Sequence, residues 1–374
     1  MSSDTQPKPL FVDDFGPATS FLVVRLGAIG DVLRVCPAVL CLRKAYPDAK
    51  IAWAVEQWVA PLLKHCPIVD RIHILDRAEL DRGGLRALKE MGRFSREIRA
   101  CRYNVALDFH GRFKSALVAW LSGAPIRVGY AKGQSTEMNH LFTNRHVFLE
   151  NKPLNRIHRF FRLLEALGIR TAFNIGNIGI SLPDAEKQAA QQWYDDAGRP
   201  ALAVYAGSST KQSAYHRWPV EKWIALLDRT GKEGISSVLF WGPDEEAFTR
   251  EIHDKVSTAC LMAPKTNLSE MMSMLACFPA FIGGNTAAMH MSWMQGVPVV
   301  FFPGPADPRI DGPIGPVAGY PLKVDHLVRH GISKRFQADV TTQVNIDEAY
   351  TAVIQCMDLA GSGRGSSATD GALG

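Results

Sequence analysis

Short apolar segments alternate with helical segments along most of the chain, and this alternation restricts the fold more than any other feature. The first apolar run, residues 21–26, leads through a glycine-containing loop into a helical pattern that ends near Tyr46, before Pro47. Further strands are predicted at 51–55, 71–75, 104–109 and 127–130, and helices at 58–65, 85–101 and 114–121. Strands that alternate with helices form βαβ units around a parallel sheet, which predicts an α/β fold.

The alternation occurs twice along the chain. A helix predicted at 158–167 is followed by an irregular stretch, 169–183, that we interpret as a linker. Beyond it, strands are predicted at 201–205, 237–241, 280–282 and 297–302, and helices at 220–232, 245–256, 268–276, 287–295 and 347–359. Since 374 residues exceed one ordinary core, we expect two Rossmann-like domains that face each other across a cleft. The expected divisions are a flexible tail at 1–20, domains at 21–175 and 176–345, a last helix at 346–359 that packs back on the first domain, and a flexible tail at 360–374.

The composition excludes several classes of protein. A hydrophobic fraction of 47% is ordinary for a globular protein, so disordered and collagen-like chains are excluded. No apolar run is long enough to span a bilayer, and the polar first twenty residues do not resemble a signal peptide. The seven scattered cysteines form no C-x-x-C pair, which is typical of reduced, mostly packed thiols in a cytosolic protein.

The charge is unevenly distributed. Residues 1–165 contain 25 Lys+Arg against 16 Asp+Glu (+9), and residues 166–374 contain 17 against 21 (−4), which together make the net +5. Either the first half binds a polyanion or an anionic surface, or its cations solvate helix faces. The predicted helix at 85–101 carries Arg86, Lys89, Arg93, Arg96 and Arg99. Because its only aromatic residue is Phe94, nucleic-acid binding is disfavoured. The favoured explanation of this charge is a solvated helix face, and contact with an anionic membrane surface is the second.

The loop after the first strand, RLGAIGD at 25–31, is the first candidate site, because ligands of such sheets bind beyond the carboxyl ends of the strands. Its glycines permit a tight turn, and Asp31 lies at the start of the next helix. An aspartate there is commonly a helix cap. At a strand end it can also take a proton from a hydroxyl group. The G-x-x-G spacing does not match a dinucleotide fingerprint, and a carboxylate would repel a pyrophosphate.

Three loops of the second half could hold a diphosphate and a nucleoside. The segment 207–219 offers hydroxyl groups, backbone N–H groups and cations ahead of a helix, and its Trp-Pro pair favours a functional loop over a plain surface loop. The GGNTAAMH segment, 283–290, presents N–H groups at a helix start, although a close-packed turn would use the same residues. The carboxylates of 241–246 suit ribose hydroxyl groups and helix dipoles equally, and His290 could equally be a core residue.

The sequence motifs of metal sites, hydrolases and nicotinamide dehydrogenases are absent from the sequence. No His, Cys or Asp cluster has metal-ligand spacing, so we expect no metal site. There is no G-x-S-x-G elbow of a hydrolase and no G-x-G-x-x-G of a nicotinamide dehydrogenase.

These loops, in their order, resemble glycosyltransferase family 9, the ADP-heptose:lipopolysaccharide heptosyltransferases. In the first half the resemblance rests on the segment 21–56 with its RLGAIGDVL element, and on NVALDFHGRFKSALVAWLSGAPIRVGY at 104–130. In the second half it rests on HRWP at 216–219, WGPDEE at 241–246, GNTAAMH at 284–290 and PVVFFPGPADP at 298–308. It covers about residues 21 to 310.

The resemblance implies a GT-B fold and an inverting transfer of heptose, or a related sugar, from an ADP-sugar to a lipopolysaccharide inner core or other lipid-linked glycan. The donor would bind to the second domain and the phosphorylated acceptor to the first. The ADP-sugar is a substrate, so no cofactor is required. The resemblance further implies a cytoplasmic protein, peripheral at the inner face of the inner membrane, with no nucleic-acid partner.

The resemblance also assigns residues. Asp31 matches the general base. The donor-binding positions are Ser208, Ser209, Thr210, Lys211, His216, Glu246, Thr266, Asn285, Thr286, Ala287 and His290. The acceptor-binding positions are Arg25, Gly30, Arg34 and Lys114.

Three positions depart from the family pattern. His216 stands where the family usually has a lysine, and Asn285 and Ala287 stand where it usually has aspartate and glycine. A catalytically silent sugar-nucleotide-binding or assembly protein, and a transferase with another donor, therefore stay open. The sequence does not determine the donor sugar, the acceptor hydroxyl group or the oligomeric state.

Overall fold

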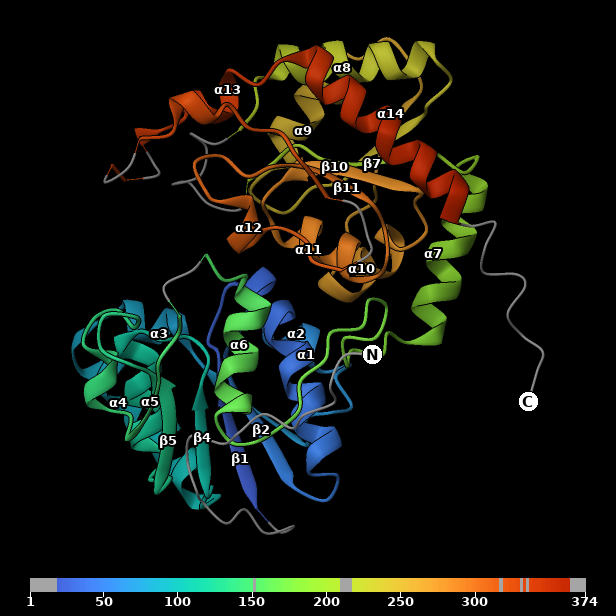
Figure 1. Cartoon of the computed structure of the whole chain (residues 1–374). Helices are drawn as coiled ribbons and strands as arrows, with labels where there is room; N and C mark the ends of the chain where they lie inside the picture. Colours follow the sequence, from blue (N-terminus) through green and yellow to red (C-terminus); the bar gives the residue numbers. More distant parts are fainter. Residues whose placement is uncertain are drawn as a thin grey trace, which may run out of the picture. The chain divides into compact units, whose positions relative to one another are not determined.

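The chain divides into two compact units, Met1–Ser181 and Leu182–Gly374 (Figure 1). The computed structural model describes residues 19–150, 153–208, 217–315, 319–329, 332–333 and 336–363. The division falls inside the predicted linker and six residues beyond the predicted boundary at 175. Of the expected tails, residues 1–18 and 364–374 lie outside the described residues. The predicted bounds are wrong at the inner ends, because residue 20 begins a strand and residues 360–363 continue the last helix.

The first unit contains one parallel six-stranded sheet in the order β3-β2-β1-β4-β5-β6. Its strands are β1 (Ser20–Val24), β2 (Lys50–Glu56), β3 (Arg71–Leu75), β4 (Val105–Asp108), β5 (Ile126–Tyr130) and β6 (Arg145–Val147). Its helices are α1 (Ile29–Ala45), α2 (Ala60–Leu63), α3 (Arg77–Asp81), α4 (Gly84–Ala100), α5 (Phe113–Leu121), η1 (Asn139–Leu141) and α6 (Arg156–Glu165). The central strand β1 is buried along its whole length, as a parallel sheet covered on both faces requires.

Helices cover both faces of this sheet. Phe94 and Ile98 of α4 and Val118 of α5 pack in one core with Leu22 and Val24 of β1. Helices α1 and α6 pack against each other, and α6 also contacts β5. In Figure 1, α4 and α5 lie next to each other beside the strands of the first sheet.

The second unit repeats this plan with a parallel sheet in the order β12-β11-β10-β7-β8-β9. Its strands are β7 (Leu202–Tyr205), β8 (Ser237–Leu239), β9 (Cys260–Met262), β10 (Ala280–Gly284), β11 (Val299–Phe302) and β12 (Gly319–Pro321). Its helices are α7 (Asp184–Asp196), α8 (Val220–Lys232), α9 (Glu246–His253), α10 (Leu268–Leu275), α11 (Ala287–Met294), α12 (Pro308–Asp311), η3 (Asp325–Leu327), α13 (Asp339–Thr342) and α14 (Ile346–Gly363).

The last helix, α14, packs against α8 and against strands β10 and β11 of its own unit. Its predicted packing against the first unit, and the predicted cleft between the units, stay predictions. Two Rossmann-like units with parallel sheets confirm the predicted α/β class and the GT-B type.

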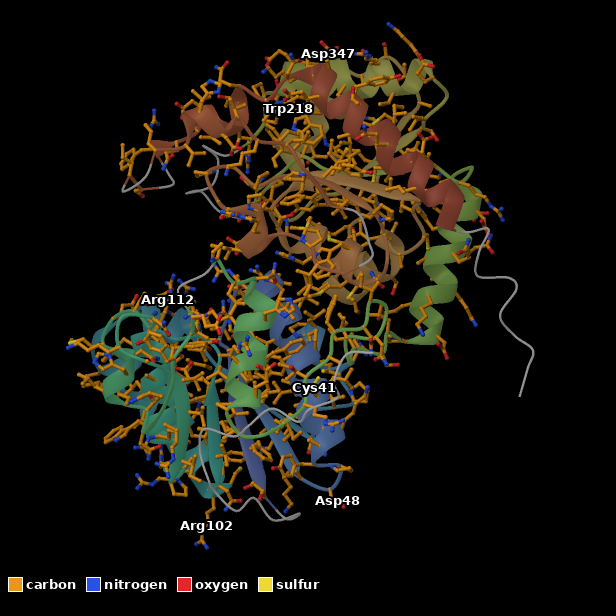
Figure 2. The ribbon with its side chains drawn as sticks, in the orientation of Figure 1. Cys41, Asp48, Arg102, Arg112, Trp218 and Asp347 are labelled. Atoms are coloured by element: carbon orange, nitrogen blue, oxygen red, sulfur yellow. The ribbon has the colours of Figure 1, made fainter. Side chains whose placement is uncertain are left out.

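Trp218 belongs to the core of the second unit, so packing explains the Trp-Pro pair, whereas the predicted function of the loop 207–219 stays a prediction because 209–216 lie outside the described residues. Only 1% of Trp218 is exposed, and its ring packs against Trp223 and Phe302 with centroids 5.2 and 5.1 Å away (Figure 2). Its indole N–H donates to the carbonyl of Val344 at 3.1 Å. An aromatic residue of this size fixes the start of α8 through packing rather than through a ligand.

The described parts of the chain contain no helix long and apolar enough to cross a membrane. All seven cysteines are free thiols, of which four are buried and three partly buried.

Candidate active site

Each sheet brings two loops together where its strand order reverses. In the first sheet β1 and β4 are neighbours, but the chain leaves β1 toward β2 and leaves β4 toward β5. In the second sheet β7 and β10 stand in the same relation. Ligands of doubly wound sheets bind at such points, beyond the carboxyl ends of the strands. The predicted loops 25–31, 207–208 and 283–287 all lie there.

Asp31 lies in the first turn of α1 and is held by two arginines. One carboxylate oxygen pairs with Nη2 of Arg25 and the other with Nη2 of Arg34. The N-cap position belongs to Ala28, so Asp31 is not the plain helix cap that was the alternative interpretation. With 19% of its side chain exposed, Asp31 can be reached from outside.

The two arginines are themselves buried and anchored to backbone. Arg25, 5% exposed, donates from Nη1 to the carbonyl of Phe109 at 3.3 Å, which links the loops after β1 and β4. Arg34, 7% exposed, donates from Nε to the carbonyl of Gly30 at 3.3 Å. Burial lowers the pKa of Arg25, and the nearby Asp31 opposes this shift. Three predicted acceptor positions therefore surround the predicted base.

Asp108, at the end of β4, organises the neighbouring loop. One carboxylate oxygen accepts the backbone N–H groups of His110 (3.0 Å) and Gly111 (3.1 Å). The other accepts from the Ser115 hydroxyl group (3.1 Å) and from Nδ2 of Asn139 (2.5 Å). The residue is fully buried, and burial raises the pKa of its carboxyl group. With four donors on one carboxylate, the loop after β4 has little freedom.

His110 is the neutral group of this site. Burial and, next, the charge of Arg25 lower the pKa of His110 to about 3, while Asp31 acts in the opposite direction. Its Nδ1 atom is buried and has no hydrogen-bond partner among the described residues. Lys114 also lowers this pKa, so the predicted acceptor lysine lies within electrostatic range of the cluster. Sequence reasoning quoted His110 within a longer motif but did not single it out.

In the second unit, Ser208 is buried in the loop after β7 and is held by Arg217. The hydroxyl oxygen accepts from Nε of Arg217 at 3.3 Å, and the backbone carbonyl accepts from Nη2 at 3.3 Å. The guanidinium of Arg217 lies over the ring of Phe248, 4.8 Å from its centroid. The predicted donor residues Ser209, Thr210, Lys211 and His216 lie outside the described residues.

Glu245, not the predicted Glu246, is the buried carboxylate after β8. Glu245 is 3% exposed and accepts a hydrogen bond from the Tyr205 hydroxyl group at 3.3 Å, while its other oxygen has no partner in the described part of the chain. Burial raises the pKa of Glu245. A methyl group on Gly207 would lie 2.4 Å from its Cγ atom, so only glycine admits this approach. Glu246 is 45% exposed and pairs with Arg250 at 2.9 Å.

The remaining predicted donor residues separate into loop and core positions. Thr286 is the N-cap residue of α11, and its hydroxyl oxygen is buried without a partner among the described residues. Asn285 and Ala287 flank it, and the N–H of Asn285 donates to the carbonyl of Phe302 at 3.2 Å. Thr266 is partly exposed in the loop after β9. His290 is 2% exposed, and its Nδ1 accepts from the indole of Trp293 at 3.0 Å, as a core histidine would.

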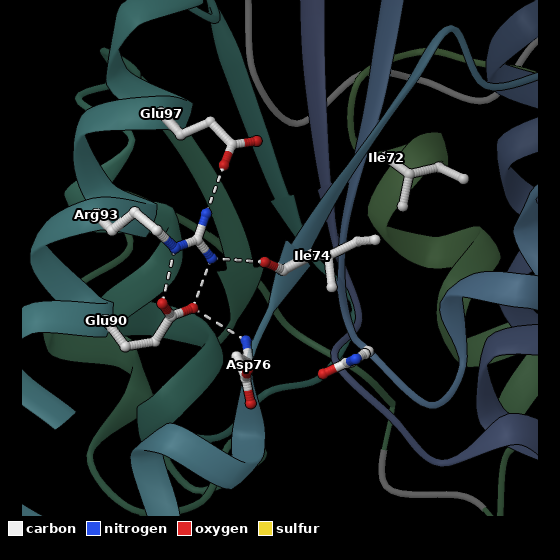
Figure 3. A pocket seen from close by; sticks show the side chains of 7 residues that line it. Ile72, Ile74, Asp76, Glu90, Arg93 and Glu97 are labelled. Atoms are coloured by element: carbon white, nitrogen blue, oxygen red, sulfur yellow. Dashed lines mark hydrogen bonds and ion pairs between the residues drawn. The ribbon is translucent and has the colours of Figure 1, made fainter. Parts of the chain in front are cut away.

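A cavity of about 430 Å³ lies away from these loops, between β3 and α4. Ile72, Ile74, Asp76, Glu90, Arg93, Glu97 and Gln57 line it (Figure 3). Its cation, Arg93, is already paired with two of the lining carboxylates, so the cavity offers no free charge to a diphosphate. The described residues contain no group of three or more His, Cys, Asp or Glu that could hold a metal ion.

The model of glycosyltransferase family 9 (heptosyltransferase) matches residues 91–323, which is more than half of the chain. The chain belongs to glycosyltransferase family 9. It is accordingly a glycosyltransferase, as the motifs indicated. The matched range of the family begins after the loop of Asp31, so the role of this residue stays a prediction.

Two relatives align with this family 9 chain over nearly their whole length. Lipopolysaccharide heptosyltransferase 1 of Salmonella typhimurium is 25% identical over 300 residues, 79% of this chain and 91% of that protein. Lipopolysaccharide heptosyltransferase 2 of Escherichia coli K12 is 25% identical over 358 residues, 89% and 98% of the two chains.

Solved structures of the same family share the fold. The glycosyl transferase family 9 protein of Veillonella parvula superimposes with a TM-score of 0.74 at 21% identity, over 91% of this chain and 97% of that one. The E. coli heptosyltransferase WaaC with ADP superimposes with a TM-score of 0.71 at 21% identity, over 90% and 100%. These similarities confirm the GT-B fold of this glycosyltransferase.

Proposed function

We propose that this glycosyltransferase moves a heptose from ADP-heptose to a lipopolysaccharide inner core, with inversion at the anomeric carbon. The observation that carries the proposal is the placement of Asp31 at the carboxyl edge of the first sheet, between two buried arginines and beside the neutral His110. The relatives named as lipopolysaccharide heptosyltransferases support the substrate class, and a family structure with bound ADP supports the donor class.

Asp31 acts as the general base. It takes the proton of the acceptor hydroxyl group as the oxygen attacks the anomeric carbon, and the bond from that carbon to the diphosphate breaks on the opposite side. A carboxylate offers about four lone-pair directions, so pairing with two guanidinium groups does not exhaust Asp31. Arg25 and Arg34 then supply positive charge to an acceptor that carries phosphate or carboxylate groups.

The second unit stabilises the leaving ADP. The buried hydroxyl group of Thr286 and the first-turn N–H groups of α11 form a positive helix end for the diphosphate. Glu245 offers a carboxylate oxygen to the ribose hydroxyl groups. The ADP-sugar is itself the substrate, so the transfer requires no further cofactor. A lipid-linked acceptor places the reaction peripherally at the cytoplasmic face of the inner membrane.

A second candidate is a family member that is catalytically silent or that uses another nucleotide sugar. Asn285 and Ala287 favour it, because the usual aspartate would have accepted hydrogen bonds from sugar hydroxyl groups. Thermal shifts with ADP-heptose, ADP-glucose, GDP-sugars and UDP-sugars separate the candidates, since a bound donor must raise the melting temperature. Binding of an ADP-sugar without any transfer would favour the silent protein.

The replacement Asp31→Asn tests the base. We expect transfer to fall by roughly 10²–10⁴-fold, the usual contribution of general-base catalysis, while ADP still raises the melting temperature. Because Arg25 and Arg34 lose their common partner, the melting temperature itself should fall, so rates are compared below it. Asp48→Asn, at an exposed turn, is the matched control. Transfer by Asp31→Asn within tenfold of wild type would contradict the assignment.

A further inference from the structure

The outer surface of α5 carries apolar side chains that no other part of the described chain covers. Phe113 and Trp120 are 39% and 52% exposed, and Leu117, at helical spacing between them, is partly exposed. The ring of Phe142 lies edge-on to both aromatic residues, with centroids 5.4 and 6.3 Å away. Leu141, 65% exposed, extends the surface from η1, which packs against α5. We call these five residues the aromatic patch.

The neighbouring helix α4 carries unpaired cations on its outer surface. Arg86, Lys89, Arg96 and Arg99, the basic stripe, recur every three to seven residues and are all exposed. Among the residues that the structure describes, none of the four has a carboxylate within ion-pair distance. Arg93 differs, because it pairs with Glu90 and Glu97 of its own helix at 2.6 and 3.0 Å and donates to the carbonyl of Ile74 in β3 at 3.0 Å (Figure 3).

The stripe and the patch lie on the same side of the first sheet. The inner sides of α4 and α5 share one core, so their outer sides face away from the sheet together. The side chain of Arg99 reaches the end of α5, where a methyl group on Gly123 would lie 3.4 Å from its Nε atom. Leu85 and Leu88, 84% and 69% exposed, add apolar surface at the start of α4.

We propose that the aromatic patch and the basic stripe form the surface by which this protein docks onto a lipid bilayer with anionic headgroups. Interfacial binding requires apolar side chains that enter the headgroup region and cations that meet anionic lipids, and both are present here. Trp120 has the amphipathic ring that is enriched at membrane–water interfaces. The basic stripe itself carries no exposed aromatic residue for base stacking, because the single aromatic residue of α4, Phe94, is buried.

This inference deepens the proposed function, since a lipid-linked acceptor must be met at a membrane. Helices α4 and α5 begin at the carboxyl edge of the sheet, where Asp31 and His110 also lie. The start of the docking surface, at Leu85, Arg86 and Phe113, therefore adjoins the edge that would receive the sugar of the acceptor, and Arg99 and Trp120 lie at the other ends of the two helices.

Co-sedimentation with vesicles tests the surface directly. The full chain should bind vesicles of phosphatidylcholine with 30% phosphatidylglycerol, bind pure phosphatidylcholine weakly, and lose binding as salt rises. Arg96→Gln/Arg99→Gln should weaken binding roughly 25-fold, from about fivefold per cation. Trp120→Gln should also weaken it. The matched control, Lys187→Gln/Lys232→Gln, removes the same charge from exposed positions of the second unit.

Transfer assays separate this inference from the proposed function. The surface variants should keep the wild-type rate with a deacylated, water-soluble acceptor and lose rate with the same acceptor in vesicles. If no transfer occurs with either acceptor, the proposed function fails while the vesicle assay still decides the surface. Equal vesicle binding by the variants and the control overturns the inference. So does concentration-dependent dimerisation that Trp120→Gln abolishes while vesicles do not bind, because the occupant is then a second copy.

Discussion

Replacing Asp108 by asparagine should destabilise the first unit by reversing one hydrogen bond. The new side chain keeps an oxygen for the N–H groups of His110 and Gly111. Its amide nitrogen, however, takes the place of the oxygen that lies 2.5 Å from Nδ2 of Asn139, so two donors face each other. The Ser115 hydroxyl group can rotate to accept, and so it adds little to the loss.

The size of the effect follows from these contacts. A buried hydrogen bond to a charged group contributes about 1.5–3 kcal/mol, and a stranded buried donor costs about 1–3 kcal/mol. The second hydrogen of the Asn139 amide keeps its bond to the carbonyl of Arg112 at 2.8 Å, and removal of a buried charge offsets part of the loss. We therefore expect the free energy of unfolding to fall by about 2–4 kcal/mol. For a domain of this size the melting temperature should fall by roughly 5–15 °C.

Urea and thermal unfolding of the full chain measure this loss, with Asp48→Asn as the exposed control. The double variant Asp108→Asn/Asn139→Asp restores a donor opposite an acceptor at this contact but removes the bond from position 139 to the carbonyl of Arg112. Its loss of stability should therefore be smaller than the sum of the losses of the two single variants. An unfolding free energy of Asp108→Asn within 0.5 kcal/mol of wild type, about the spread of neutral surface changes, would refute the reasoning. A double variant less stable than the sum of its singles would refute it too.

Two further predictions concern residues that the sequence did not single out. Glu245→Gln should weaken ADP binding by about tenfold, measured by calorimetry, because we propose that its buried oxygen binds the ribose. Glu246→Gln should change the affinity less than twofold. A larger effect of Glu246→Gln would favour the assignment of Glu246 made from the sequence. His110 should show no imidazole titration by NMR between pH 5 and 8, since its pKa is about 3 in the folded protein. The unfolded chain binds this proton at a higher pH than the folded protein does, so the contribution of neutral His110 to stability is fully present above pH 6.5 and declines as pH falls toward 3. An NMR titration midpoint near pH 6 would contradict this prediction.

The central strands β1 and β2 were predictable because their residues are largely apolar and buried. Strands β1, β2 and β3 and helix α8 begin and end within two residues of their predicted bounds. The missed strands β6, β9 and β12 have three residues each and lie at sheet edges, where half of the side chains meet solvent and no apolar run develops. Helix α7 was missed because its sequence, DAEKQAAQQWYDD, is polar on most of its surface.

The positions of the candidate site residues along the chain were predictable, but their interaction partners in the fold were not. Strand-end loops identified Asp31, and the resemblance added Arg25 and Arg34, yet their mutual pairing needs coordinates. Sequence cannot tell which of two adjacent glutamates turns inward after β8, since Gly207 decides this from 38 residues away. Trp218 was misjudged for a related reason: its neighbours in the chain are polar, whereas its neighbours in space, Trp223 and Phe302, are not.

The positive charge of the first half has two separate roles, and burial distinguishes them. A cation that only solvates a helix is exposed and makes no structural hydrogen bonds, but Arg25 and Arg34 are nearly buried and bind backbone carbonyl groups beside Asp31. Burying a guanidinium group is expensive unless it is paired, and Asp31 provides such a pairing for both arginines. The four cations of the basic stripe are exposed and have no ion-pair partner in the described part of the chain, so they could be lost without loss of fold. Neutralising Arg96 and Arg99 should therefore affect membrane binding alone, whereas removing Arg25 should affect both stability and transfer.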